Sequence, residues 1–279
     1  MSESSVFFHL HIPKTAGSLF NLILRKNFGN QFIHENPYLS TQQYSETDIR
    51  AMLNFYSFRA YAGHVFRLNN IPFDDVCNLT CISFVRDPIE KYFSFYFFQR
   101  SRIESNDKAE AKLFGLETYI DWQITNQNQL NPMMVDSGQL EWVSGSRKMN
   151  EELESYLKSG KYLIFPSDRF LEACLVLEKK FPRSFRNCSF HSDVNVSVRD
   201  QEISNKCTEK VKMFPWIQPD MAFHRRANEM LDEMIASCFA TKEDFNRALE
   251  ELNRRNSQLR KNNSMKSRIK RRIVKVFNL

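Results

Sequence analysis

The start of the chain constrains the fold most, because an apolar run there is followed at once by a short loop of small residues and a helical pattern. Val6–Ile12 reads VFFHLHI, a mostly apolar segment typical of a buried parallel strand. Thr15–Lys26 then places apolar residues at spacings that favour a helix. A strand, a turn and a helix in this order predict a βα unit and therefore an α/β fold.

The same alternation continues along the chain. Further strands are expected at Tyr61–Val65, Leu79–Val85 and Tyr162–Phe165. A helix is expected from about Ile89 to Arg102, with Asp87 as its N-cap and Pro88 at the first helical position. Two more are expected, one capped by Ser167 and running to about Lys180, and one over Ala222–Phe239. Ser105–Lys112 is charged and predicts a loop or a short exposed helix. The chain has 279 residues, a length that suits one large domain, and its 25 Phe predict an aromatic-rich core. We expect residues 1–250 to form a single α/β domain in which helices flank a central parallel sheet.

The first chemical signal lies in the loop between the first strand and its helix, which reads His-Ile-Pro-Lys-Thr-Ala-Gly-Ser over residues 11–18. Backbone N–H groups at a helix N-terminus attract anions, the small residues allow close approach, and Lys14 adds a charge. The loop is P-loop-like but is no Walker A motif, because Lys14 precedes the only Gly. The alternative is an ordinary strand–helix turn.

The second signal is Phe-Val-Arg-Asp-Pro-Ile-Glu-Lys-Tyr-Phe-Ser over residues 84–94. Arg86 ends a strand, where ligands bind in open α/β sheets, and Ser94 lies about two helical turns later. An arginine fork and a hydroxyl could then converge on one phosphate. The alternative is that Arg86 only pairs with Asp87 or Glu90.

Together the two signals resemble the carbohydrate sulfotransferases that use 3′-phosphoadenosine 5′-phosphosulfate (PAPS). The first resembles their 5′-phosphosulfate loop and the second their 3′-phosphate motif. The resemblance spans about residues 6 to 240 and is closest to the branch that contains heparan sulfate 2-O-sulfotransferase and its bacterial relatives. Further matching segments are residues 62–65 (Ala-Gly-His-Val), 167–170 (Ser-Asp-Arg-Phe), 195–197 (Asn-Val-Ser), and Asp220 with Phe223.

The resemblance implies a role for each matching residue. Lys14 would stabilise the leaving group, and His64 would be the general base that accepts the acceptor proton. Arg86 and Ser94 would hold the 3′-phosphate, and PAPS would be the co-substrate with no metal required. The remaining donor-binding residues would be Thr15, Ala16, Gly17, Ser18 and Leu19.

The other histidines near these motifs have different expected roles. His9 and His11 alternate on a strand among apolar neighbours, which favours structural histidines. His34 beside Glu35 is a reserve base. Two other functions stay open: a nucleotide or small-molecule kinase with a degenerate phosphate loop, and a non-catalytic nucleotide-binding relative or scaffold.

Charge is uneven along the chain. Ten of the 39 Lys and Arg lie from Arg254 onward, where there is no Asp or Glu, so the rest carries 29 basic against 33 acidic residues. We therefore expect no nucleic-acid partner. Residues 251–279 predict a basic tail, either an amphipathic helix on an anionic membrane surface or a solvated or body-packed segment. The apolar residues of that helix would be Met265, Ile269, Ile273, Val276 and Phe277.

The chain shows neither a signal peptide nor a transmembrane run, and its six Cys include no CxxC pair. We expect reduced thiols and a cytoplasmic protein, with peripheral contact at the inner membrane surface as the alternative for the tail. The expected acceptor is a hydroxyl on a carbohydrate or glycolipid.

Overall fold

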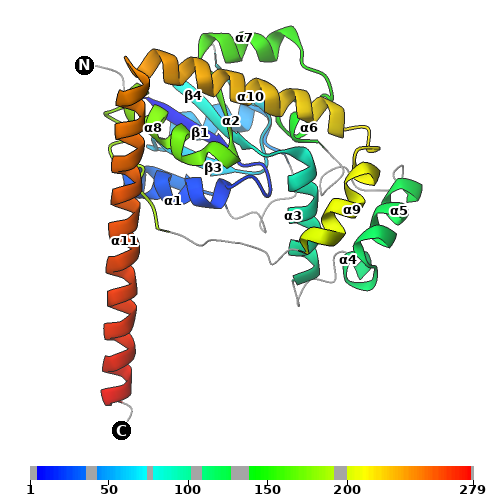
Figure 1. The fold of residues 1–279 in the computed structure, drawn as a ribbon. Coiled ribbons are helices and arrows are strands. Elements are labelled where there is room, and N and C mark those ends of the chain that lie inside the picture. Colours follow the sequence, from blue (N-terminus) through cyan, green and yellow to red (C-terminus); the bar gives the residue numbers. More distant parts are fainter. Residues whose placement is uncertain are drawn as a thin grey trace.

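The computed structural model describes residues 5–35, 43–73, 78–101, 109–126, 138–191 and 200–277, with side chains except at 109–110 and beyond 261. Within these ranges, five strands form one parallel sheet (Figure 1). The predicted α/β fold with a central parallel sheet is therefore confirmed. The spatial order is β2 (Phe32–His34), β3 (Ala60–Gly63), β1 (Val6–Leu10), β4 (Leu79–Val85) and β5 (Tyr162–Pro166).

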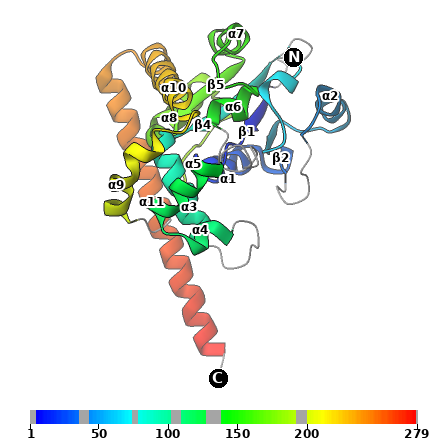
Figure 2. The same ribbon diagram turned by 90° about the vertical axis from the view of Figure 1, so that its right-hand side faces the viewer.

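Helices surround this sheet, and a group of them stands beyond one end of it (Figures 1 and 2). Those around the sheet are α1 (Gly17–Phe28), α2 (Glu46–Phe55), α6 (Gln139–Ser144), α7 (Glu151–Ser159), α8 (Phe170–Lys180) and α10 (Ile217–Cys238). Those of the group are α3 (Pro88–Ser101), α4 (Ala109–Leu113), α5 (Leu116–Asn126) and α9 (Gln201–Val211). The last helix is α11 (Lys242–Phe277), and short 3₁₀ turns cover Gly29–Gln31, Leu68–Asn70 and Ser167–Arg169.

Two predicted helix starts have different outcomes. Asp87 caps α3 as expected, because its Oδ1 accepts the N–H groups of Ile89 at 3.0 Å and Glu90 at 2.9 Å. The predicted cap by Ser167 is wrong. Ser167 opens a 3₁₀ turn, and α8 begins after Arg169 without any side-chain cap.

The core is aromatic, as the Phe content predicts. Phe7 on β1 contacts three other rings, those of Phe28, Phe181 and Phe185, at centroid distances of 5.7, 5.1 and 5.0 Å. A separate buried cluster joins α3, α5 and α9 and includes Tyr92. The sheet and the helical group therefore have distinct cores, and α10 contributes to both, with Ile217 in the helical cluster and Phe223 in the core of the sheet.

Helix α11 runs without a break through residue 250, where the body was expected to end. Its first half is anchored on the body: Leu252 is buried, and Arg255 pairs with Glu178 of α8 at 2.8 Å. The second half extends away from the body (Figure 1). Among the described residues, no helix is both long and apolar enough to cross a bilayer.

Candidate active site

The strand order brings the three predicted motifs to one edge of the sheet. Because β3, β1 and β4 are parallel neighbours, their carboxyl ends lie side by side. His64 follows β3, the Lys14 loop follows β1, and Arg86 follows β4. The Nδ1 atom of His64 contacts the carbonyl oxygen of His11, which joins two of the motifs directly.

The loop at residues 11–16 has a backbone suited to an anion. Lys14 and Ala16 both have φ of 68°, in the left-handed region that residues other than Gly seldom adopt. Such strain concentrates at functional sites, and turns of this kind can direct successive N–H groups to one side. Ala16 precedes α1 without a side-chain cap, so a ligand could accept bonds from the first N–H groups of the helix.

Two loop residues are fixed by packing. A Cβ at Gly17 would lie 1.9 Å from Cδ2 of His11, so only Gly fits where α1 begins. The Thr15 hydroxyl donates to the carbonyl of Ile12 at 2.9 Å, and its side chain is buried. The Thr15 side chain therefore stabilises the loop, and only the backbone of Thr15 would be left to bind the sulfuryl donor. Ser18 is exposed, and Leu19 packs against the core.

Lys14 has an unusual environment for a cation. Its Nζ lies 4.0 Å from the ring centroid of Phe98 on α3, and within the described ranges no carboxylate pairs with it. Burial lowers the pKa of Lys14 to about 8, and the nearby charge of Arg86 adds to the shift. Phe98 lies one turn after Ser94 on the same face of α3. Lys14 therefore lies against the face of α3 that carries Ser94, with the charge of Arg86 nearby, and an anion bound there would be close to two cations.

Arg86 is held through its backbone by a buried side chain that the sequence did not reveal. Its N–H donates to Oε1 of Gln139 at 2.8 Å, and its carbonyl accepts from Nε2 of Gln139 at 2.7 Å. Asp220 on α10 in turn accepts the N–H groups of Gln139 at 2.6 Å and Leu140 at 2.9 Å. Asp220 thus holds the N-terminus of α6, and Gln139 on that helix holds the backbone of Arg86.

The Arg86 guanidinium also approaches Glu90 at 3.6 Å, so the alternative pairing expected from sequence exists. Both side chains are about a third or more exposed, at 33% and 41%. A long, partly exposed ion pair contributes little to stability. An incoming phosphate could therefore compete with Glu90 for the guanidinium.

His64 is set up as a neutral proton acceptor. A carbonyl oxygen can only accept, so the contact with His11 requires the proton on Nδ1 and leaves the Nε2 lone pair free. Burial lowers the pKa of His64 to about 4. The imidazole is therefore neutral at neutral pH, in the tautomer that a base acting through Nε2 needs.

The neighbouring histidines form a stack behind His64. The ring of His11 lies 4.1 Å from that of His64 and 5.1 Å from that of His9. His9 bonds Asn21 at 2.8 Å, and burial lowers the pKa of His9 to about 3 and that of His11 well below its usual range. Both are buried neutral side chains, which agrees with their predicted structural role.

His34 and Glu35, the two residues named as a reserve base, lie in different environments. His34 is exposed on the edge strand, whereas the Glu35 carboxylate lies under the end of β3, so that a Cβ at Gly63 would be 2.4 Å from Glu35 Oε2. Both carboxylate oxygens are buried, and no described residue forms a hydrogen bond with them. Burial raises the pKa of Glu35, and the nearby Tyr44, Tyr61 and the His64 backbone oppose this rise.

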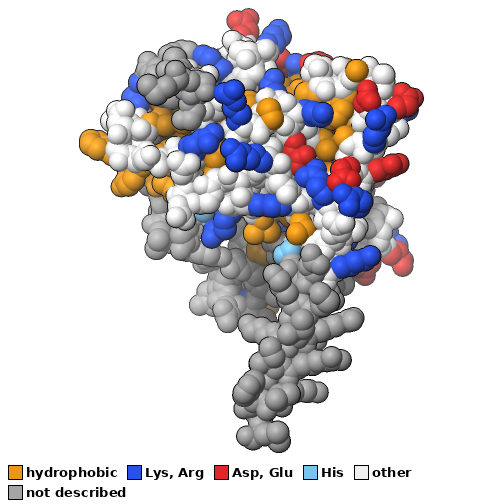
Figure 3. All heavy atoms as spheres, turned by 90° about the vertical axis from the view of Figure 1, so that its left-hand side faces the viewer, with side chains coloured by type: hydrophobic (Ala, Val, Ile, Leu, Met, Phe, Trp, Pro, Cys, Tyr) orange, Lys and Arg blue, Asp and Glu red, His pale blue; other side chains and the backbone are white. Residues whose placement is uncertain are grey.

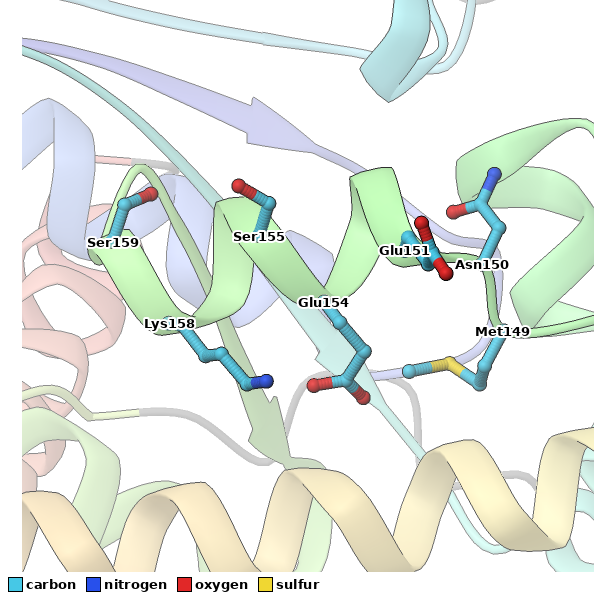
Figure 4. A pocket seen from close by; sticks show the side chains of 7 residues that line it. All are labelled: Met149, Asn150, Glu151, Glu154, Ser155, Lys158 and Ser159. Carbon is cyan, nitrogen blue, oxygen red and sulfur yellow. The ribbon is translucent and has the colours of Figure 1, made fainter.

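Other segments of the resemblance lie elsewhere. Arg169 pairs with Glu172 at 2.6 Å and Asp232 at 2.7 Å, which ties α8 to α10 rather than forming a site. Residues 195–197 lie outside the described residues. A surface hollow beside α7, lined by Glu154 and Lys158 among others, includes none of the predicted site residues (Figure 4). Among the described residues, no cluster of His, Cys, Asp and Glu is arranged to hold a metal.

No family model and no curated protein matches the chain. Among solved structures, it is similar to mouse sulfotransferase SULT7A1 complexed with PAP, at 13% identity over 90% of each chain and a TM-score of 0.40. A likeness this distant carries no argument about activity. The function must therefore be argued from the residues of this chain.

Proposed function

We propose that this protein is a sulfotransferase that moves a sulfuryl group from PAPS to a hydroxyl of a carbohydrate or glycoconjugate. The observation that carries the proposal is the convergence of Lys14, Arg86 and His64 at the carboxyl edge of the sheet. Two cations beside an uncapped helix N-terminus suit a donor with two separated anionic groups. A neutral imidazole beside them suits removal of a hydroxyl proton. The closer assignment to the heparan sulfate 2-O-sulfotransferase branch rests on the sequence motifs alone.

In the proposed reaction, the acceptor oxygen attacks sulfur and the bond from sulfur to the bridging oxygen of the donor breaks. The acceptor proton passes to Nε2 of His64, and adenosine 3′,5′-bisphosphate leaves. Lys14 and the first N–H groups of α1 would balance the charge that develops on the leaving group. Arg86 and Ser94 would bind the 3′-phosphate and so orient the donor for in-line attack.

A donor screen separates the three functions. The purified protein is offered PAPS or Mg-ATP with a panel of sugars and glycolipids, and products are identified by mass spectrometry. We expect sulfated products with PAPS only. Phosphorylated products with Mg-ATP would favour the kinase, and tight bisphosphate binding without any product would favour the non-catalytic relative.

Binding of truncated donors tests the role of Arg86. Removal of the 3′-phosphate should weaken binding of adenosine 3′,5′-bisphosphate by about 1.5–3 kcal/mol, the scale of hydrogen bonds to charged groups. In Arg86→Ala, calorimetry should find nearly equal affinities for the bisphosphate and 5′-AMP. Arg254→Ala, an exposed arginine on α11, is the matched control and should keep the wild-type difference. Equal affinities in the wild type would refute the assigned 3′-phosphate site.

A further inference from the structure

Arg67 is a buried cation close to the proposed active site that the donor does not require. It lies four residues after β3, and its residue is 8% exposed. Its guanidinium makes one long hydrogen bond, from Nη1 to the carbonyl of Phe66 at 3.3 Å. No carboxylate in the described ranges forms an ion pair with it. Glu141, the acid whose charge acts on Arg67, is bonded to Arg147 at 2.8 Å.

Trp142 connects this cation to the proposed base. The Arg67 guanidinium carbon lies 4.7 Å from the Trp142 ring centroid, and the His64 ring centroid lies 6.3 Å from it on a perpendicular plane. The guanidinium and the imidazole are therefore no more than 11.0 Å apart. The indole N–H of Trp142 is buried, and no described residue accepts a hydrogen bond from it. Trp142 lies one turn after Gln139 on α6, the helix that fixes Arg86.

A buried charge without a counter-charge is unfavourable, and the aromatic face of Trp142 compensates only part of the lost hydration. Burial indeed lowers the pKa of Arg67 to about 10. Such a cation normally pairs with an anion, and the described part of the chain supplies none. An anion carried by a ligand would fill this role, and in the proposed function the acceptor hydroxyl lies beside His64.

We propose that Arg67, backed by Trp142, is a subsite for an oxyanion on the acceptor, so that the protein acts on acidic rather than neutral carbohydrates. The inference rests on the proposed function, because it takes His64 as the base beside the acceptor. A guanidinium binds planar carboxylates and phosphates through paired N–H groups, so either group fits. The attached sugar would extend from Arg67 toward His64 along the indole.

The test uses the full chain saturated with adenosine 3′,5′-bisphosphate, which occupies the Lys14 and Arg86 region. Calorimetry compares glucuronate, glucose 6-phosphate and glucose as ligands. We expect at least one acidic sugar to bind about ten- to a hundredfold more tightly than glucose, the scale of hydrogen bonds to a charged group. The tighter of the two acids identifies a carboxylate or a phosphate as the natural group.

Arg67→Met removes the charge, keeps much of the volume, and should abolish the preference for acidic sugars. Arg67→Gln is a second neutral variant, and the exposed Arg50→Met is the matched control that should keep the preference. Equal affinities for the three sugars in the wild type, or an unchanged preference in both Arg67 variants, would overturn the proposal. Failure of the bisphosphate to bind would contradict the proposed function. The same sugar titrations without the bisphosphate would then still test the Arg67 subsite.

Discussion

At the scale of single residues, burial lowers the pKa values of the two proposed catalytic groups, and these values set the acidic and alkaline limits of activity. His64 must be neutral to accept a proton, and its pKa of about 4 means that activity is lost as pH falls through that value. Lys14 must be charged, and its pKa of about 8 means that activity is lost as pH rises through that value. We expect kcat/KM to be bell-shaped between these limits, because this ratio reports the free protein.

Variants assign each limb to its residue. Lys14→Arg should extend the alkaline limb upward, because a guanidinium stays charged. In the profile of kcat both limbs should lie at higher pH, because the bound donor is anionic and favours the protonated form of each group. An alkaline limb that stays in place in Lys14→Arg would remove Lys14 from this role.

Loss of the imidazole tests the base. His64→Ala should lower kcat by about 10²–10⁴-fold while bisphosphate binding stays nearly intact. His224→Ala is the control and should keep full activity, because His224 lies on α10 and contacts Asp168 at 3.3 Å. Full activity in His64→Ala would mean that another group accepts the proton, and Glu35→Gln would then be the next variant to assay.

At the scale of elements, α6 should act on the donor without touching it. Gln139→Leu removes both bonds to the Arg86 backbone, so the bisphosphate should lose much of its advantage over 5′-AMP in calorimetry. Gln123→Leu is a matched control, because Gln123 is equally buried and bonds Tyr92 and Tyr119 instead. Both variants should lose about 1–3 kcal/mol of unfolding free energy, measured by denaturant titration. A donor effect of equal size in both would indicate general destabilisation rather than positioning.

The sequence predicts elements well where a local pattern determines them. Leu79–Val85 is bounded as expected, and α3 begins where Asp87 caps it. The strand β2 was missed, because two half-buried residues and one exposed residue on a sheet edge leave little periodicity. That Lys14, His64 and Arg86 follow neighbouring strands at one edge of the sheet was predictable, because their surroundings form recognisable motifs. The contacts of Gln139, Trp142 and Arg67 were not predictable, because they join segments that are far apart in the chain.

At the scale of the whole molecule, α11 is a long helix whose described side chains anchor it on the body through its first half. Its 36 residues make a helix of roughly 54 Å, of which the part near Leu252 and Arg255 packs on the body. The face that carries α11 shows Lys and Arg across much of its described surface, with Asp and Glu mostly toward one side (Figure 3). An acidic face that would draw the basic end of the helix back onto the body is not evident in this view.

We therefore propose that the end of α11 binds an anionic membrane surface and brings the site to a lipid-linked acceptor. The sequence from Arg254 onward has ten basic residues and no acid, and each basic residue near an anionic surface contributes about 1 kcal/mol. Cosedimentation at low salt should recover the full chain with vesicles of anionic phospholipid and leave it in solution with neutral vesicles. A chain truncated after Ser264 should stay in solution with both while keeping its bisphosphate affinity, since the anchoring residues remain. Added salt should release the full chain, because it screens the attraction. Identical partitioning of the two chains would leave the tail as a solvated helix.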